Sequence, residues 1–375
     1  METLIDDCMK MGFGLMRLPR EKTSKRDVID VEQTKLMVDA FIEAGGRYFD
    51  TAFIYPGSEA AIKLALCDRY PRESYYLATK LNAGEFACKS EADARNEINI
   101  SLQRTGAGYF DFYLLHALAA NNKKRYEEFG LWDFVRQLKA EGKIKHYGFS
   151  FHDRPELLDQ LLTEHPDAEF VQLQINYADW DEPGVQSRAC YEVAVKHGKP
   201  VVVMEPVKGG MLANPPEQVK QVFQRVDDSA SMASWAIRFA ASLPGVMMVL
   251  SGMSSLEQMK DNVSYMEHFR LLSEVELQAV EQARETLAGI DHIACTGCHY
   301  CTPGCPVEMH IPEIFSVMNV YKMYGDLHRA RMDYSWRPGG SKASACLQCG
   351  QCEDACPQHL PIVSYLQEVV EKLER

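Results

Sequence analysis

Three apolar runs in the first third of the chain each lead to a side chain that can take part in proton transfer. The first run ends at Asp50 with Tyr55 five residues later, the second ends at Lys80, and the third ends at His116. A phenol with a pKa of about 10 is a poor acid at neutral pH, but a nearby cation favours the phenolate and lowers that pKa. Lys80 can supply the cation, Asp50 can fix it by ion pairing, and His116 can hydrogen-bond a substrate or relay a proton. Together the four groups can tune one proton donor.

Each of these four residues alone is as well explained by a structural salt bridge or a satisfied buried polar group. Their shared position at the ends of apolar runs favours chemistry, because parallel strands deliver such side chains to one edge of a sheet. Short, nearly all-apolar segments alternate with helical segments over residues 11–265, which is typical of strands buried on both faces. We expect strands at 11–16, 47–50, 75–79, 110–115, 145–150, 169–175, 200–205 and 246–251, and helices at 31–45, 58–66, 91–102, 130–141, 153–162, 185–197, 229–242 and 256–265.

Strict alternation favours either a closed α/β barrel or a doubly wound sheet. No Gly-x-Gly-x-x-Gly lies between the first strand and the first helix, which counts against a Rossmann fold. The order and context of Asp50, Tyr55, Lys80 and His116 resemble the catalytic tetrad of the aldo-keto reductases, and the opening stretch 12–18 resembles that family's first strand. The resemblance covers roughly residues 11–265. It implies a (β/α)8 TIM barrel in which Tyr55 donates a proton while a nicotinamide delivers hydride to a carbonyl carbon.

The resemblance also implies a set of residues that contact the nicotinamide dinucleotide. Glycines can bring backbone close to a pyrophosphate, although Gly209 and Gly210 also fit an ordinary turn. The last loop and helix hold Lys260 as their only cation, so both NADP and NAD are retained as cofactors. The expected contacts are Gly14, Met16, Ser150, Gln174, Asn176, Pro206, Lys208, Gly209, Gly210, Ser251, Gly252, Ser254, Gln258, Asp261 and Asn262.

The C-terminal region contains two runs of four closely spaced cysteines. Each run has the form Cys-x2-Cys-x2-Cys-x3-Cys-Pro, which matches the bacterial ferredoxin pattern. A zinc site would instead pair two Cys-x2-Cys knuckles across a longer gap. In two-cluster ferredoxins the fourth cysteine of each run serves the other cluster. We therefore expect two [4Fe-4S] clusters, one on Cys295, Cys298, Cys301 and Cys356, and one on Cys346, Cys349, Cys352 and Cys305.

Length and composition indicate a large domain followed by a smaller one. We place an aldo-keto reductase-like barrel at residues 1–288 and a mainly helical ferredoxin-type domain at 289–375, because cysteine content rises there. The net charge of −13 argues against nucleic acid as a partner. No apolar run approaches the roughly 18 residues of a membrane span, and the N-terminus lacks a basic, then apolar, signal pattern. We expect a cytoplasmic protein without a membrane partner.

Three functional hypotheses follow. The first is an oxidoreductase that interconverts a small carbonyl and its alcohol with NAD(P), and whose clusters transfer electrons. The second is an electron-transfer protein whose barrel binds nicotinamide or flavin while the clusters pass electrons to a redox protein partner. The third gives the clusters a purely structural role. FMN has no motif of its own here, although barrels bind it at their phosphate loops.

Overall fold

The computed structural model describes residues 4–5, 8–21, 28–85, 87–182, 185–336 and 339–375. Two compact units make up the chain. The barrel unit comprises Met1–Asn176, Ser187–Pro206 and Ala233–Leu272, and the cysteine unit comprises Tyr177–Gln186, Val207–Met232 and Ser273–Arg375. Two segments that interrupt the barrel in sequence therefore group with the cysteine region. The domain division expected at 288/289 stays a prediction.

All eight expected strands form, and they close a parallel barrel in chain order. Strands β3 and β4 run further than expected, because β3 stays paired with β4 through Lys80 and Leu81, and β4 stays paired with β5 as far as Leu118↔Phe151. Lys80 and His116 consequently lie inside strands rather than just after them. The strands are β1 (Met11–Gly14), β2 (Tyr48–Asp50), β3 (Tyr76–Leu81), β4 (Phe110–Leu118), β5 (Ile144–Phe151), β6 (Phe170–Gln174), β7 (Val201–Met204) and β8 (Val246–Ser251).

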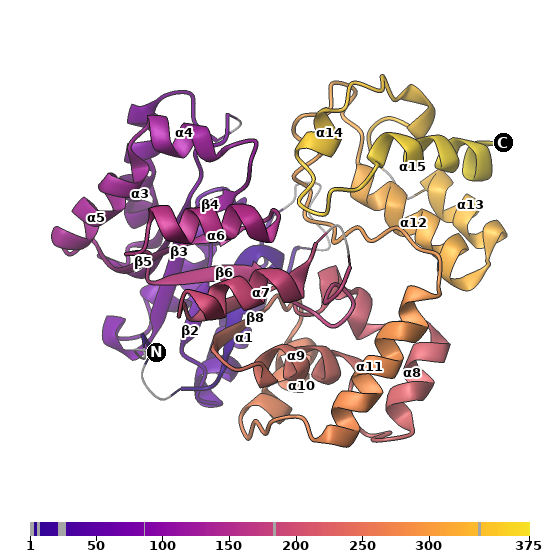
Figure 1. Cartoon of the computed structure of the whole chain (residues 1–375), viewed down its shortest axis with the longest axis horizontal. Coiled ribbons are helices and arrows are strands. Elements are labelled where there is room, and N and C mark those ends of the chain that lie inside the picture. Colours follow the sequence, from indigo (N-terminus) through magenta and orange to yellow (C-terminus); the bar gives the residue numbers. More distant parts are fainter. Residues whose placement is uncertain (1–3, 6–7, 22–27, 86, 183–184, 337–338) are drawn as a thin grey trace. The chain divides into compact units, whose positions relative to one another are not determined.

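Helices cover the outside of these strands (Figure 1). In the barrel unit they are α1 (Val31–Glu43), α2 (Ser58–Ile62), α3 (Glu91–Thr105), α4 (Lys123–Glu128), α5 (Leu131–Ala140), α6 (Pro155–Glu164), α7 (Ser187–Lys196), α9 (Met232–Ser242) and α10 (Leu256–Met266). The helix expected at 58–66 is divided, because α2 continues as a π-turn over Lys63–Cys67. Helix α4 was not expected, since its polar sequence buries only Tyr126.

The cysteine unit is mainly helical, as expected. Helix α11 starts at a capping box, in which the Ser273 hydroxyl accepts from the Glu276 N–H and the Glu276 carboxylate accepts from the Ser273 N–H. Short helices among the cysteines and loops carry too little periodicity to be predicted. The helices are α8 (Glu217–Gln224), α11 (Glu274–Ala288), α12 (Ile311–Tyr324), α13 (Leu327–Trp336), α14 (Gln351–Asp354) and α15 (Ile362–Val369).

An apolar layer fills the barrel interior below the polar strand ends. Successive strand residues point to opposite faces, so every second residue points inward. Inward-facing Tyr48, Ala78 and Leu114 belong to this layer, together with Phe112, Phe170, Val202, Met248 and Leu250. Two residues beyond Tyr48, Ala78 and Leu114 are Asp50, Lys80 and His116. The alternation that packs the core therefore also points these three polar side chains into the barrel interior, beyond the apolar layer.

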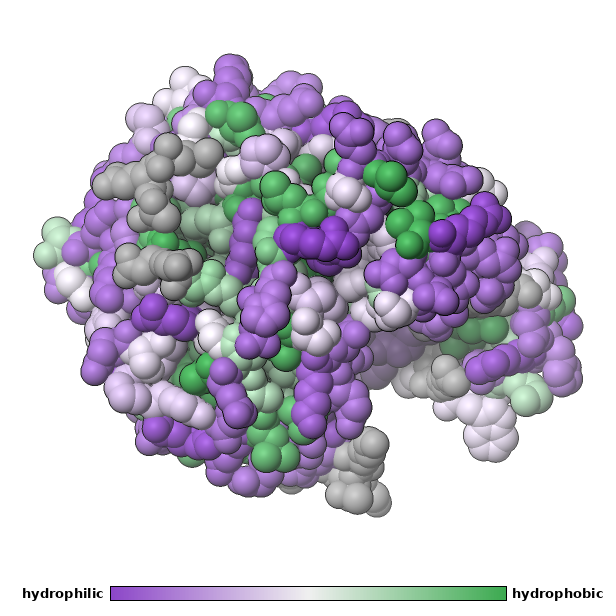
Figure 2. All heavy atoms as spheres, turned by 90° about the horizontal axis from the view of Figure 1, so that it is seen from below, coloured by the Kyte–Doolittle hydropathy of each residue, from purple (hydrophilic) through white to green (hydrophobic). Residues whose placement is uncertain are grey.

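The surface is mostly polar. Figure 2 shows a face covered largely by hydrophilic side chains, with smaller apolar groups between them. Among the described residues, Trp336, Leu347 and Leu271 are the most exposed large apolar side chains. Within the same residues, no helix combines the length and apolar character needed to cross a membrane.

A buried carboxyl group on α3 supports the end of β3. The Glu97 Oε2 accepts a hydrogen bond from the Asn82 N–H at 2.8 Å, two residues after Lys80. Its Oε1 is buried without a hydrogen-bond partner. Burial raises the pKa of Glu97 to about 8, the Asn82 N–H and Arg104 oppose this shift, and Glu59 adds to it. A neutral carboxylic acid thus ties α3 to the strand that carries Lys80.

Glu97→Gln tests this assignment through the pH dependence of stability. Because the pKa is raised on folding from its ordinary value of 4.5 to about 8, wild type loses stability as the pH rises through that window. The variant lacks this loss, so its stability relative to wild type should rise by at most about 1.4 kcal/mol per pH unit between those values. Urea unfolding at several pH values measures it, with exposed Glu91→Gln on the same helix as control. Parallel curves for wild type and Glu97→Gln would contradict a neutral Glu97.

Candidate functional site

The four residues expected to act together do converge at the carboxyl ends of β2, β3 and β4. The Lys80 Nζ lies 2.5 Å from the Asp50 Oδ1 and donates to the Thr51 carbonyl at 2.7 Å. The same nitrogen lies 4.9 Å from the centroid of the Tyr55 ring. The rings of Tyr55 and His116 meet edge to face, with centroids 5.8 Å apart. One ammonium group thus contacts both an acid and a phenol, next to an imidazole.

Burial controls the protonation of this group. It lowers the pKa of the Lys80 ammonium, and the Asp50 carboxylate counteracts that shift. Burial, with the charges of Lys80 and His152, holds the pKa of His116 well below its ordinary value of 6.5. His116 is therefore neutral at physiological pH and can donate a hydrogen bond to a substrate oxygen without carrying a charge of its own.

The loop that carries Tyr55 is fixed at both ends. The Thr51 and Ser58 hydroxyls lie 2.7 Å apart, and the Ser58 hydroxyl donates to the Leu15 carbonyl at 3.0 Å. Between them, the Phe53 N–H donates to the Lys80 carbonyl at 3.2 Å. The loop is thereby attached to the strand that supplies Lys80, which fixes the phenol relative to the ammonium.

Several supporting side chains of the site are not marked by any motif. The Gln172 side chain on β6 faces Asp50; burial raises the pKa of that carboxyl, and Lys80 and Gln172 oppose the shift. The Tyr126 hydroxyl on α4 donates to the His116 carbonyl at 2.6 Å and accepts from the Ala83 N–H at 3.2 Å. The inward period of β6 would have indicated Gln172, which follows buried Phe170 by two residues. Nothing in the polar sequence of α4 identifies Tyr126.

Most of the residues expected to contact a dinucleotide lie at the strand ends of the barrel unit or on α10, and four of them bond in pairs. The Ser251 hydroxyl donates to the Asn262 Oδ1 at 2.7 Å, and the Ser254 N–H donates to the Gln258 Oε1 at 2.7 Å. The Ser150 hydroxyl accepts from the Ala117 N–H at 2.7 Å. Gly14, Met16, Gln174, Asn176, Pro206, Gly252 and Asp261 lie at or just after the ends of β1, β6, β7 and β8, or on α10. Their roles toward a cofactor stay predictions.

Arg17 adds a cation to this edge that the sequence alone does not reveal. Its backbone carbonyl accepts from the Ser254 hydroxyl at 2.7 Å, and its side chain lies beside Gly252. The guanidinium pairs with Glu205 at 3.2 Å. Arg17 comes from the loop after β1, so its proximity to the loop after β8 depends on closure of the barrel between those strands. Lys260 is therefore not the sole cation near that loop.

The three remaining expected contacts, Lys208, Gly209 and Gly210, belong to the cysteine unit. Lys208 is buried, and its ammonium donates to the equally buried Asp179 carboxylate. All three have positive φ angles. The loop after β7 is therefore held by a buried ion pair, and its lysine is already bound to a carboxylate.

Four cysteines from both runs line one pocket of about 340 Å³ in the cysteine unit, part of which is open to solvent. They are Cys305 from the first run and Cys346, Cys349 and Cys352 from the second. The remaining wall is apolar and includes Pro306, Val307, Met309, Ile311, Leu347, Val363 and Leu366. This is the set expected for the second cluster, including the cysteine from the other run.

The other four cysteines also face one another. Burial raises the pKa of the Cys301 thiol, and nearby Cys298, Cys295 and Cys356 raise it further. The two runs share one backbone form. The offset that carries Cys295 onto Cys346 also relates left-handed Gly297 to Gln348, His299 to Gly350 and Glu308 to His359. It further relates the first residues of α12 and α15. This internal repeat gives each run the same path, so that each fourth cysteine reaches the opposite set.

The sulfur atoms are spaced more widely than a tetrahedral zinc site requires. In a tetrahedral site with Zn–S bonds of about 2.3 Å, the sulfurs lie about 3.8 Å apart. No three cysteines of the described chain bring their sulfurs within 4.8 Å of one another. A cubane distributes its four ligands over four iron atoms and so needs wider spacing. Backbone N–H groups also approach the sulfurs, from Gly297 to Cys295 and from Gln348 to Cys346, both at 3.4 Å.

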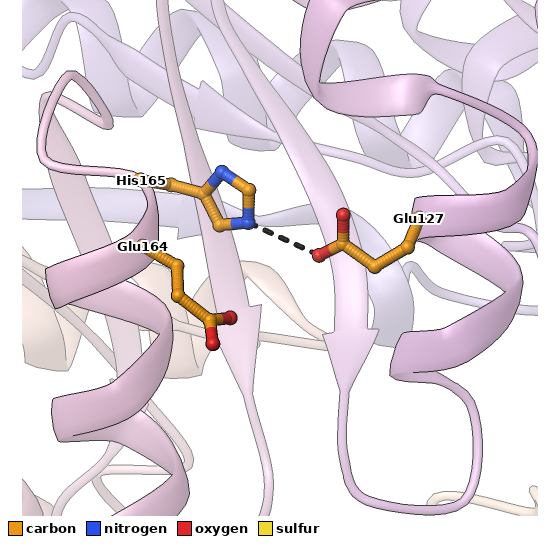
Figure 3. Close-up of side chains that lie close together, drawn as sticks. All are labelled: Glu127, Glu164 and His165. Atoms are coloured by element: carbon orange, nitrogen blue, oxygen red, sulfur yellow. Dashed lines mark hydrogen bonds and ion pairs between the residues drawn. The ribbon is translucent and has the colours of Figure 1, made fainter.

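Elsewhere in the described residues, one group has metal-ligand proximity: Glu127, Glu164 and His165 (Figure 3). Its members already have protein partners. The Glu127 carboxylate lies 3.0 Å from the His165 Nε2 and accepts from the Trp132 indole N–H at 3.1 Å. The His165 ring stacks on Trp132 with centroids 3.8 Å apart. Both glutamates are exposed, and we assign no metal to this group.

Comparison with known proteins identifies the family. The family model for the aldo/keto reductase family matches residues 10–285, and the model for a 4Fe-4S dicluster domain matches residues 294–360. The chain therefore belongs to the aldo/keto reductase family and carries a 4Fe-4S dicluster domain after its barrel. An uncharacterized oxidoreductase of Bacillus subtilis is 25% identical over 307 residues, covering 73% of this chain and 92% of that protein.

Solved structures share the fold. The holo form of an aldo-keto reductase from Bacillus halodurans has a TM-score of 0.58 at 24% identity and covers 73% of this chain and 91% of its own. An aldo-keto reductase from Klebsiella pneumoniae in complex with NADPH has a TM-score of 0.57 at 22% identity, with coverage of 73% and 90%. These likenesses establish the TIM-barrel fold.

Iron content of paired cysteine variants tests the exchange of the fourth cysteines. We expect about eight iron atoms in wild type and about four in Cys305→Ala and in Cys349→Ala, because each removes one ligand. If Cys305 and Cys349 bind the same cluster, the double variant Cys305→Ala/Cys349→Ala also keeps about four iron atoms. The matched double variant Cys298→Ala/Cys305→Ala removes one ligand from each expected set and should keep almost no iron. Iron and sulfide analysis after anaerobic purification measures this. The reverse result for the two double variants would show that each run binds its own cluster.

Proposed function

We propose that the protein is a nicotinamide-dependent oxidoreductase that interconverts a small carbonyl compound and its alcohol, and that its C-terminal domain carries two [4Fe-4S] clusters. The observation that carries the first part is the contact of one buried ammonium, Lys80, with both Asp50 and Tyr55. The barrel of a Klebsiella pneumoniae relative in complex with NADPH supports the same cofactor class. NADP and NAD both fit the proposal.

The chain's own residues would move the proton and hold the substrate oxygen. The nicotinamide, when bound, supplies or accepts hydride at the carbonyl carbon. Lys80 stabilises the phenolate that forms when Tyr55 gives its proton to the developing alkoxide. Neutral His116 donates a hydrogen bond to the same oxygen. Asp50 keeps the ammonium in place, and the reverse steps oxidise the alcohol.

The eight clustered cysteines would hold the two clusters as thiolates. Their thiols are partly or wholly buried apart from Cys349, and coordination to iron replaces the proton of each. The apolar walls and the N–H donors toward Cys295 and Cys346 suit a cluster, because burial and hydrogen bonds to sulfur set its potential.

A second candidate function, electron transfer to a redox protein, has one observation in its favour. Leu347 and Cys349 of the second run are exposed, and Leu347 also lines the four-cysteine pocket. An exposed apolar side chain at a cluster offers a short path to a docked partner. NADPH-dependent reduction of a one-electron acceptor, independent of any carbonyl, would favour this role.

Tyr55→Phe tests carbonyl reduction. Removing the phenolic proton donor should lower carbonyl-dependent NADPH oxidation at least about 100-fold, because general acid catalysis contributes about that much. Binding of NADPH, followed by its fluorescence, should stay within twofold of wild type. The assay screens small aldehydes and ketones under anaerobic conditions.

Tyr113→Phe is the matched control. Tyr113 is a fully buried tyrosine whose hydroxyl has no hydrogen-bond partner, and it lies on β4 away from the tetrad row. It should keep wild-type turnover. Equal turnover in Tyr55→Phe and wild type would remove Tyr55 from the chemistry, whereas equal losses in both variants would point to damage to the barrel.

A further inference from the structure

The loop after β7 contacts the first cysteine run at the backbone level. A Cβ added to Gly209 would lie 2.1 Å from the Thr296 carbonyl oxygen and 2.7 Å from its carbon. Thr296 is buried and directly follows Cys295. Only a glycine permits this approach, and the backbone at Gly209 is also left-handed, with φ of +65°. Both residues belong to the cysteine unit.

The peptide group that Gly209 contacts also reaches a sulfur atom. Its carbonyl is that of Thr296, and its N–H, on Gly297, lies 3.4 Å from the Cys295 Sγ. A peptide is planar, so a shift of its carbonyl moves its N–H as well. Hydrogen bonds to cluster sulfurs contribute to the reduction potential. Two contacts, joined by one rigid peptide, thus connect Gly209 with the electronic environment of Cys295.

The second run has the same N–H geometry but a different neighbour. The Gln348 N–H lies 3.4 Å from the Cys346 Sγ, and the preceding residue is the exposed Leu347. The loop after β7 is itself anchored, since buried Lys208 pairs with buried Asp179 from the segment after β6. The internal repeat is therefore asymmetric at this position: the peptide after Thr296 lies against a barrel-derived loop, and the peptide after Leu347 follows an exposed side chain.

We propose that Gly209 is a positioning residue for the cluster held by Cys295, Cys298, Cys301 and Cys356, and that a dinucleotide on the loop after β7 changes the reduction potential of that cluster. This rests on the proposed function, because Lys208, Gly209 and Gly210 are among the residues expected to contact the dinucleotide. Binding of the cofactor to the loop then changes the reduction potential of one cluster. The other cluster, with exposed Leu347 beside it, does not respond.

Gly209→Ala tests the contact, and Gly210→Ala is its control. Both glycines have positive φ, but a Cβ on Gly210 meets no atom within 4 Å. Gly209→Ala should displace the Thr296 peptide and weaken the hydrogen bond to Cys295. Because such a bond favours the reduced cluster, the reduction equilibrium of one cluster should fall at least about tenfold, or about 59 mV for one electron. Gly210→Ala should leave both potentials at their wild-type values.

EPR-monitored redox titration of the full-length protein gives the readout, and Cys298→Ala, which lacks a ligand of the first set, assigns the shifted signal. If Gly209→Ala loses the cluster, iron should fall by half while the other cluster keeps its potential, which also supports the proposal. The pair Lys208→Gln/Asp179→Asn frees the loop without adding volume and should shift the same cluster. Unshifted potentials in both variants, or equal shifts in Gly210→Ala, would overturn it.

Oxidised NADP⁺ and NAD⁺, which cannot donate hydride, test the second part in wild type. A bound dinucleotide should shift the potential of the first cluster alone, and the shift should disappear in Gly209→Ala. Binding without any shift would overturn the coupling and leave the proposed function intact. Absence of both binding and iron would instead reject the proposed function itself.

Discussion

The ion pair between Lys80 and Asp50 is the constraint on which the barrel site depends. Two charges taken out of water lose hydration worth several kcal/mol each, and only close contact with further hydrogen bonds offsets that loss. Here the ammonium lies 2.5 Å from a carboxylate and also donates to the Thr51 carbonyl. The pair leaves Lys80 poised against the Tyr55 ring. A lysine held this way cannot turn to solvent, so its effect on the phenol is built into the fold.

The rest of the barrel keeps that pair in place. The apolar layer below excludes water from one side, and Glu97 fixes the end of β3 just beyond Lys80. Tyr126 joins the ends of β3 and β4 through the Ala83 N–H and the His116 carbonyl. These supports come from helices outside the barrel. Site geometry therefore depends on the helix layer as well as on the strands.

Features that depend on neighbouring residues in the sequence could be predicted, and features that depend on distant residues could not. Eight apolar runs were each sufficient evidence for a strand, and the period of two within them accounts for the inward direction of Asp50, Lys80 and His116. Arg17 beside Gly252 could not be predicted, because it requires β1 to pair with β8 across most of the barrel sequence. Gln172 was open to prediction, since it follows Phe170 by two residues on an inward row.

In the cysteine region, too, some features could be predicted from the sequence and others could not. Spacing alone indicated two sets of four ligands, and the two matching runs already contained the repeat that relates their left-handed residues. The sequence did not indicate that the segments after β6 and β7 belong to the cysteine unit. This depends on contacts between distant residues, such as Lys208 with Asp179 and Gly209 with Thr296. Contacts between segments distant in sequence are the part that periodicity cannot supply.

The barrel can remain stable although the segments after β6 and β7 belong to the cysteine unit. The barrel core is made by inward and helix-facing strand residues, and loops at the carboxyl ends add little to it. Here they make contacts within the cysteine unit instead: the Tyr177 ring packs edge to face on the Phe223 ring, and the Arg284 guanidinium of α11 pairs with the Asp181 carboxylate at the surface. The cysteine unit is therefore not formed by the C-terminal region alone. Its scaffold includes the segments after β6 and β7, which follow the carboxyl ends of barrel strands, the edge at which the site residues Asp50, Lys80 and His116 also lie.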